Sequence, residues 1–339
     1  MKKGIYILSL LLLIGNISFA QFVGKDGVSK ALFYLQKSEL DSAKKFIDEA
    51  VLDEKINSLA KTWYYKGFIY KELYKKREKD DKNSTYRLEA ISSLKKLQTI
   101  DSEKEFSESS AKMLNYMAST LYNDAARSLT PSTYKLAEDN YEKFRSTMLL
   151  SKPNVNLLPQ DIKFKLALAS MLNNNAQQEN KLDSAKSQEI ITGYKKVLEL
   201  DSNNGSANYN IGILYYNKAA SIINEMDYDM DLEELDKLQD VCIDLFLESL
   251  PFMLRSYDLK WNLGETLIGL VNIYHGLNDE EKEATYKKEL EYLQDSKRIV
   301  ELEAKMKELV DSGQQDSERY LNTKVELELL KKKYGEIDK

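Results

Sequence analysis

The sequence predicts an all-α fold, a helical solenoid of about six helix pairs that ends in a C-terminal helical hairpin or short coiled coil. Two recurring spacings indicate this class. In the first, a small or apolar residue is followed by a large one four positions later and another small or apolar one three further on. In the second, a small or β-branched residue is followed by a tyrosine three positions later. The 339 residues include 4 prolines and 13 glycines, so sharp chain breaks are few.

We call the first spacing the B motif and the second the A motif. The B motif occurs at Ala43, Ile47 and Ala50; Ala90, Leu94 and Leu97; Ala137, Tyr141 and Phe144; Ile190, Tyr194 and Val197; and Ser249, Met253 and Ser256. The A motif occurs at Ala31 and Tyr34, Gly67 and Tyr70, Gly212 and Tyr215, and Val271 and Tyr274. Together they predict helix pairs near 27–53, 58–100, 107–149, 160–201, 205–258 and 262–310.

In two of these pairs, the A motif and the B motif are separated by more residues than in the first pair. Ala31 and Ala43 are 12 residues apart, whereas Gly67 and Ala90 are 23 apart and Gly212 and Ser249 are 37 apart. The first excess coincides with the charged run 75–83, and the second predicts an unusually long helix pair.

Polar residues and prolines mark the expected helix boundaries. Asp41-Ser42, Ser132-Thr133 and Asp183-Ser184 carry side chains that can cap helix N-termini, and Pro131 and Pro159 suit helix entries. The run 173–180, NNNAQQEN, predicts a polar loop.

Residues 1–20 have the pattern of a signal peptide. Lys2 and Lys3 precede an apolar run over 5–14, and Ser18-Phe19-Ala20 has the form of a cleavage site. We therefore expect a mature chain that begins at Gln21 and is exported to the periplasm, or alternatively secreted, without stable membrane insertion. An uncleaved anchor is the other interpretation of this segment. No cysteine lies near the cut, which disfavours a lipid anchor.

The C-terminal residues 296–339 form two amphipathic stretches. Ile299, Leu302, Met306 and Leu309 have heptad-like spacing, the run 311–317 (DSGQQDS) breaks the helix, and apolar residues resume at Leu321. Two heptads are too few for a confident parallel coiled coil, so an antiparallel hairpin is the simpler interpretation.

The spacing resembles that of the tetratricopeptide repeat, whose helix A carries a small–large pair and whose helix B carries a small–aromatic–small set. Residues 207–215 (ANYNIGILY) and 63–70 are the most similar copies, and Leu198-Glu-Leu-Asp-Ser202 resembles the family's repeat-closing Leu-Asp-Pro. Residues 250–274 are similar to the closing repeat of exported Bacteroidetes-type members. The resemblance implies a repeat array over 21–295, although Glu283 stands where the family has a small residue.

Few residues could carry catalysis or hold a metal, so we expect no enzyme and no cofactor. The single histidine, His275, excludes a histidine cluster, and the single cysteine, Cys242, lies in an apolar helical run that favours a small buried side chain. The segment Asp227–Glu234 alternates acidic residues as a calcium loop does. Leu232 and Leu238 stand where that loop needs glycine and glutamate, so a helix cap is favoured while cation binding stays open.

The net charge of −6, which becomes −8 without Lys2 and Lys3, makes nucleic acid a poor partner. In tetratricopeptide arrays, the exposed face of helix A contacts a partner polypeptide. Carrying that register over gives the candidate groove residues Tyr64, Phe68, Lys71, Asn115, Ser119, Tyr122, Tyr209, Ile213, Tyr216, Ile268, Asn272 and His275. Asn217 is added because it follows Tyr216 and its amide could bond a bound backbone. The alternative is that some of them pack against the next repeat.

The resemblance therefore implies a non-enzymatic scaffold of the cell envelope that holds a protein or peptide partner in a concave groove. The alternative is a structural or oligomerising subunit that associates with further copies through its C-terminal helices.

Overall fold

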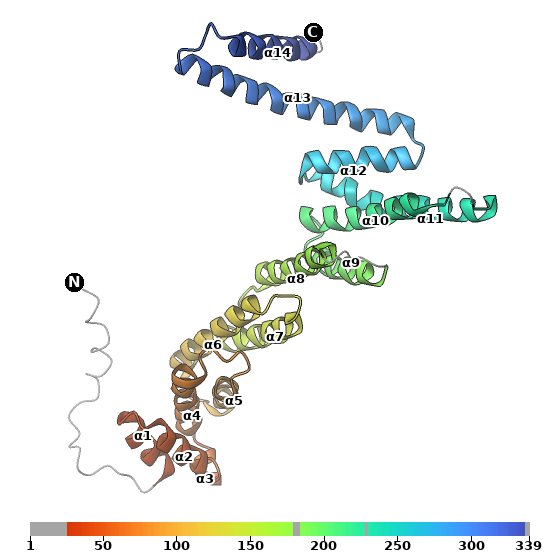
Figure 1. Cartoon of the computed structure of the whole chain (residues 1–339). Coiled ribbons are helices and arrows are strands. Elements are labelled where there is room, and N and C mark those ends of the chain that lie inside the picture. The colour runs from red at the N-terminus through yellow and green to blue at the C-terminus, as the bar shows by residue number, and fades with distance from the viewer. Residues whose placement is uncertain (1–25, 179–183, 228–229, 336–339) are drawn as a thin grey trace. The chain divides into compact units, whose positions relative to one another are not determined.

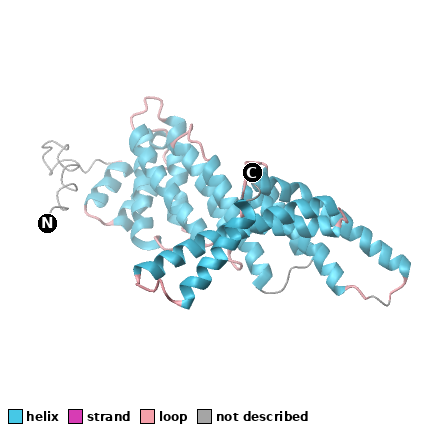
Figure 2. Cartoon of the chain, turned by 90° about the horizontal axis from the view of Figure 1, so that it is seen from above, coloured by secondary structure: helices cyan, strands magenta, loops and turns pink. Residues whose placement is uncertain are grey.

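The computed structural model describes residues 26–178, 184–227 and 230–335 (Figure 1). Every regular element among these residues is a helix, and they contain no strand (Figure 2). The predicted all-α class is confirmed. The contacts divide the chain into two compact units at Leu157/Leu158. The predicted signal peptide lies outside the described residues, and none of the described helices has the length and apolar character needed to cross a membrane.

The first unit consists of three successive helix pairs. Its elements are α1 (Gly27–Gln36), α2 (Leu40–Ala50), α3 (Glu54–Asn57), α4 (Ala60–Leu73), the π-helix η1 (Tyr74–Glu78), α5 (Thr85–Ile100), α6 (Ser107–Arg127) and α7 (Tyr134–Ser151). The main contacts join α1 to α2, α4 to α5 and α6 to α7. These are the first three predicted pairs.

The second unit is also built from successive helix pairs. Its elements are α8 (Leu158–Gln178), α9 (Ser184–Leu198), α10 (Gly205–Glu225), α11 (Leu232–Asp258), α12 (Leu263–Gly276), α13 (Glu280–Asp311) and α14 (Glu318–Gly335). The pairs are α8 with α9, α10 with α11, and α12 with α13, and α14 then packs on α13. With 21 and 27 residues, α10 and α11 form the long pair that the sequence predicts.

The B motif forms the core of the helix pairs. All of its residues are buried, from Ala43 in α2 to Ser256 in α11. Opposite it, the glycine of the A motif lets the paired helix approach closely. A Cβ atom at Gly67 would lie 2.7 Å from Leu94, and one at Gly212 would lie 2.6 Å from Met253. Both contacts join the small residue of helix A to the large central residue of helix B, which is why the two spacings recur together.

The extra residues of the second pair build a buried charged cluster. After α4 the chain continues as η1, and Tyr74 is almost fully buried. Arg87 of α5 donates to Asp124 of α6 over 2.5 Å and to the carbonyl of Lys82 over 2.8 Å. The side chains of Arg87 and Asp124 are each 1% exposed. The inserted segment is thus held against the next helix pair by an ion pair removed from water.

Two boundary predictions were wrong. Residues 173–178 belong to the last turns of α8 and do not form a loop, because Asn173 and Ala176 are buried in the second unit. Asn173 donates to the Asn210 side chain of α10 over 3.3 Å, which satisfies its polar amide. Helix α2 begins at Leu40, one residue before the predicted cap Asp41, because Leu40 joins the core.

Thr133 does precede α7, as predicted, but its side chain makes no capping bond. Its hydroxyl donates to the carbonyl of Ser128 over 2.8 Å, so it closes the preceding turn. Asp183 lies outside the described residues.

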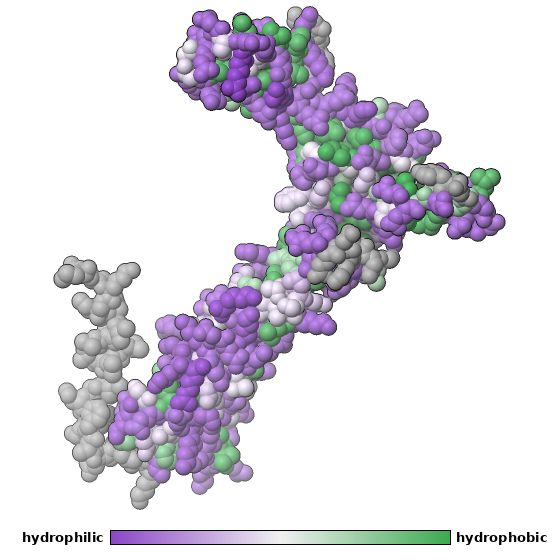
Figure 3. Space-filling view, viewed as in Figure 1, coloured by the Kyte–Doolittle hydropathy of each residue, from purple (hydrophilic) through white to green (hydrophobic). Residues whose placement is uncertain are grey.

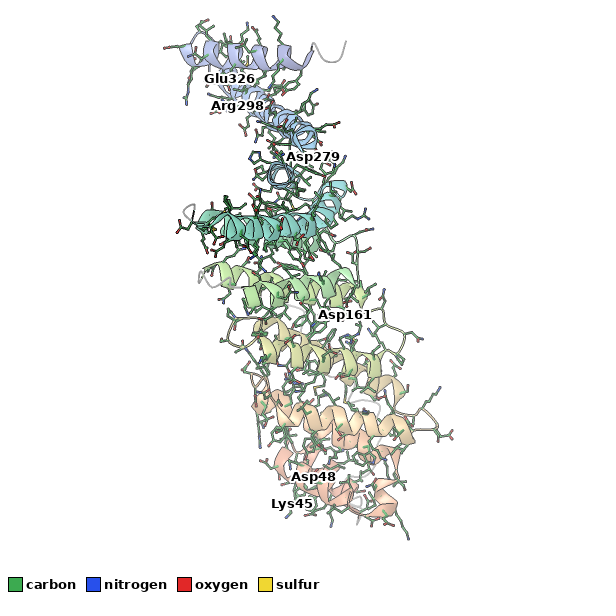
Figure 4. All side chains as sticks on the ribbon, turned by 90° about the vertical axis from the view of Figure 1, so that its right-hand side faces the viewer. Lys45, Asp48, Asp161, Asp279, Arg298 and Glu326 are labelled. Carbon is green, nitrogen blue, oxygen red and sulfur yellow. The ribbon has the colours of Figure 1, made fainter. Side chains whose placement is uncertain are left out.

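The predicted C-terminal hairpin is present. The run 311–317 separates α13 from α14, and Leu302, Leu309 and Leu327 are buried between the two helices. Arg298 of α13 and Glu326 of α14 form an ion pair of 2.7 Å (Figure 4). Asp279 is the N-cap of α13, and its carboxylate accepts from the amide of Lys282. Helix α13 crosses residues 295 and 296, where the sequence placed the end of the repeat array, without interruption.

Candidate functional site

The candidate residues of the first unit take part in helix packing. The Tyr64 ring stacks on Phe106, which precedes α6, with ring centroids 4.5 Å apart. Tyr122 of α6 meets Phe144 of α7 edge to face at 5.1 Å. Both tyrosines are half-buried. Their rings therefore contribute to packing between helices, which is the alternative that the sequence left open.

Phe68 and Asn115 are half-buried as well. Phe68 packs against the apolar cluster at the junction of α4, α5 and α6, and the Lys71 ammonium lies 4.1 Å above its ring. Ser119 is exposed and donates to the backbone carbonyl of Asn115 over 2.9 Å. Among these four side chains, Phe68, Lys71 and Asn115 are partly covered, and Ser119 is the exposed one.

In the second unit, α10 and α12 bring candidate residues together. Asn272 of α12 donates to the Tyr216 hydroxyl of α10 over 3.2 Å. A Cβ atom at Gly269 of α12 would lie 3.8 Å from Cδ1 of Ile213. Burial, together with the charge of Glu265 at the start of α12, raises the pKa of Tyr209. The predicted residues of α10 thus face α12 along two helical turns.

Met253 of α11 explains why α10 and α12 lie next to each other. Its side chain lies against Gly212 of α10 and contacts Gly269 of α12. It is fully buried, and Ser249, one turn earlier, donates to the carbonyl of Gly212 over 2.7 Å. One side chain of helix B therefore joins two successive A helices at positions where neither has a Cβ.

The outer part of this surface belongs to α12. Ile268 is 39% exposed, and Asn272 and His275 are exposed one turn apart. The His275 side chain is 78% exposed, and its Nδ1 lies 3.0 Å from the Glu283 carboxylate of α13. Glu283, which departs from the family pattern, thus contacts the histidine. Asn217 of α10 is also exposed.

We call the set Tyr209, Ile213, Tyr216, Ile268 and Asn272 the α10–α12 face. Hydrophobic side chains reach the surface in this part of the second unit (Figure 3). Tyr209 and Tyr216 are half-buried rather than solvent-facing, since the Tyr216 ring also lies 6.0 Å from Phe246. Packing on α10 therefore involves Tyr209 and Tyr216 in addition to Gly212 and Tyr215 of the A motif.

Chemically, the α10–α12 face combines aromatic area with amide groups. Tyrosine rings provide contact area at low entropic cost, and an exposed amide can both donate to and accept from an extended backbone. No charged residue belongs to the set, and Glu265 lies at its edge.

One contact that the sequence interpretation missed extends this region toward α8. Asn210 accepts from Asn173 of α8 and donates to the carbonyl of Ser206 over 2.8 Å.

Helix α8 carries no A motif. In the α8–α9 pair, the glycine that lets the two helices approach closely lies on α9 instead of on the first helix of the pair. A Cβ atom at Gly193 of α9 would lie 3.3 Å from the Ala169 side chain. A small residue on α8 followed by a glycine on α9 is the sequence pattern that could have predicted this contact.

The cysteine and the acidic segment singled out in the sequence take part in packing and helix capping. The described residues contain no cluster of three or more histidine, cysteine or acidic side chains able to hold a metal ion. Cys242 is buried with its Sγ 3.7 Å from the carbonyl of Ala219, and burial raises the pKa of its thiol. In the acidic segment Asp227–Glu234, Asp231 caps α11 by accepting from the amide of Glu234 over 2.8 Å. Residues 228 and 229 of that segment are outside the described residues.

No protein-family model and no curated protein matches this chain. Among solved structures, one of Pseudomonas aeruginosa PilF is 15% identical, with 79% of this chain and 90% of that chain covered and a TM-score of 0.28. A human IFIT1 dimer with m7Gppp-AAAA is 13% identical, with coverages of 90% and 67% and a TM-score of 0.26. At such TM-scores these likenesses carry no argument about function, and the fold rests on the helix pairs of this chain itself.

Proposed function

We propose that this chain is a non-enzymatic, tetratricopeptide-like scaffold, exported to the periplasm, that holds an extended segment of a partner polypeptide on the α10–α12 face. One observation carries the proposal. Two successive A helices, joined through Met253, present aromatic and amide side chains side by side, with Ile268 and Asn272 exposed. A polypeptide is the partner class that this combination suits best.

The support for export is the sequence pattern of residues 1–20, and the support for a protein partner includes the net charge of −6. Fractionation of the producing cells together with N-terminal sequencing tests the first part. Mature protein that begins at Gln21 in the soluble envelope fraction is expected. Protein that retains Met1 in the cytosol would contradict the location.

The binding face is best tested at its exposed residues. Tyr209→Ala with Tyr216→Ala removes half-buried rings and the partner of Asn272, so loss of binding could follow from a disturbed fold. Ile268→Ala with Asn272→Ala truncates two exposed side chains and leaves both half-buried rings in place. Leu247→Ala is the matched control, because Leu247 of α11 is 52% exposed and is not part of the face.

In co-purification from envelope extract, the Leu247→Ala variant should retain the polypeptides bound by the unmodified chain. The Ile268→Ala/Asn272→Ala variant should retain about tenfold less, since truncating two interface side chains commonly costs that much or more. Equal thermal midpoints would show that the fold is intact. Equal retention by both variants would rule out this face.

A further inference from the structure

Helix α14 has two different faces. Toward α13 it places Thr323 and Leu327, which are 3% and 8% exposed. On the opposite side lie Leu321, Val325 and Leu329, which are 54%, 56% and 64% exposed. These three residues are spaced four apart, so they form one apolar row along the helix. A row of this length and exposure is unusual for a helix that already has one buried side.

The charged residues of α14 also differ between the side that faces α13 and the opposite side. Glu326 pairs with Arg298, Lys331 with Glu303 at 2.6 Å, and Lys333 with Asp295 at 2.7 Å, all across to α13. Glu318 and Lys332 behave differently. Each is exposed, and among the ion pairs of the described residues neither takes part.

Glu318 and Lys332 continue the apolar row at its two ends. Glu318 lies three residues before Leu321, and Lys332 lies three residues after Leu329. With a rotation of about 100° per residue, all five residues fall on one side of the helix. We call Glu318, Leu321, Val325, Leu329 and Lys332 the α14 stripe.

The α14 stripe is symmetric in position and opposite in charge about Val325. Leu321 and Leu329 each lie four residues from Val325, and Glu318 and Lys332 each lie seven residues from it. When two such helices cross antiparallel at Val325, each Leu321 meets Leu329 of the other copy, and each Glu318 meets the other copy's Lys332. A parallel pair would instead place glutamate against glutamate and lysine against lysine.

We propose that the α14 stripe is a docking surface for a second copy of this chain, paired antiparallel about Val325. Two-fold pairing of one patch with itself is the commonest form of homo-oligomer. The pairing covers the apolar row and gives both unpaired end charges a partner of opposite sign. This inference goes beyond the proposed function and uses none of the residues of the α10–α12 face.

The expected dimer is weak. Helix α14 has 18 residues, which corresponds to a contact about 27 Å long and one helix wide. Such a contact is smaller than the roughly 800 Å² per partner of a standard interface. The full chain should therefore exchange between monomer and dimer in the micromolar range.

Sedimentation velocity of the full chain over a concentration series tests this proposal. The unmodified chain should shift from monomer to dimer as its concentration rises. Val325→Glu should stay monomeric over the same range, because two buried carboxylates would face each other at the symmetry axis. A monomer at every concentration, or a dimer that Val325→Glu leaves unchanged, overturns the proposal.

Charge reversal tests the antiparallel orientation. Glu318→Lys and Lys332→Glu should each weaken the dimer about tenfold, since each replaces two attractions with two repulsions. The Glu318→Lys/Lys332→Glu double variant should regain the original dissociation constant. In a parallel dimer, neither single reversal would change the sign of any contact, so unchanged affinity in the single variants overturns the orientation.

Lys324→Glu is the matched control for net charge, because Lys324 is exposed on α14 away from the stripe. It should leave the dimer unchanged. Circular dichroism should show the same helix content in all variants, which separates loss of docking from loss of α14. If Lys324→Glu weakened the dimer as much as the charge reversals in the stripe, the effect would come from the net charge of the chain, and the proposal would be overturned.

Discussion

The α10–α11 pair and the α13–α14 hairpin are both antiparallel helix contacts, but different forces hold them. Between α10 and α11, fully buried Met253 lies against Gly212, and buried Ser249 donates to the carbonyl of Gly212. Between α13 and α14, three ion pairs, in which every side chain except the half-buried Asp295 is exposed, surround a short row of buried leucines. The α10–α11 pair should therefore tolerate changes in salt and pH, and the hairpin should tolerate changes in side-chain volume at its edges.

The largest effect should come from removing the side chain that α10, α11 and α12 share. Met253→Ala leaves a cavity between two glycines that cannot fill it, and we expect a loss of about 2–5 kcal/mol in the free energy of unfolding. Urea unfolding followed by circular dichroism measures it. Leu247→Ala, an exposed site in the same helix, should change stability by less than about 0.5 kcal/mol.

Adding one methyl group at the same contact should have the next largest effect. The Cβ of Gly212→Ala would lie 2.6 Å from the Met253 side chain and 3.3 Å from its backbone nitrogen. The backbone atom cannot move as a side chain can, so we expect a loss of about 1–3 kcal/mol by the same measurement. Gly264→Ala in α12 is the control, because its Cβ would meet nothing closer than 3.9 Å. A stabilised Gly212→Ala variant would show that α10 and α11 can separate at little cost.

Acid should loosen the hairpin before it loosens the repeat pair. Hydrogen bonding from Arg298 lowers the pKa of Glu326, and hydrogen bonds from Lys333 and Tyr334 lower the pKa of Asp295. Groups with a lowered folded pKa stabilise above their unfolded value of about 4, and that stability is lost as the pH falls through the folded pKa. Hydrogen-exchange protection of α14, corrected for intrinsic rates, should therefore fall below this pH while that of α10 persists.

Salt should give the smallest effect. The hairpin ion pairs are largely exposed, so raising the ionic strength should reduce the hydrogen-exchange protection of α14 slightly and leave that of α11 unchanged. Arg298→Ala should remove part of this salt dependence. If the salt response stays the same in this variant, the pair with Glu326 contributes nothing measurable.

The sequence was sufficient to predict the helix pairs because the B motif and the A motif meet each other in space. Met253 and Gly212 were both identified from spacing, and they are in contact. What spacing cannot predict is which neighbour covers the outward side of an A helix. Tyr64 is covered by Phe106, a residue between two motifs, whereas Tyr216 meets Asn272 of the next A helix.

The same limit explains the missed end of α8. The amides of 173–178 are polar, and polarity predicts a loop when no partner is visible in the sequence. Asn173 finds its partner in Asn210, 37 residues later, and the amide–amide bond compensates its burial. The sequence shows that a polar group would be unfavourable when buried, but it does not show the hydrogen bond that compensates the burial.

Within each unit, the pairs form between helices that follow one another in the chain, and this determines how the protein can be made. Closing such contacts requires only short loops, and chains dominated by local contacts fold rapidly. The core of the α1–α2 pair also includes residues of the following helices up to Met117, and it contains no residue of the second unit. The first unit can therefore acquire structure while the second unit is still being synthesised.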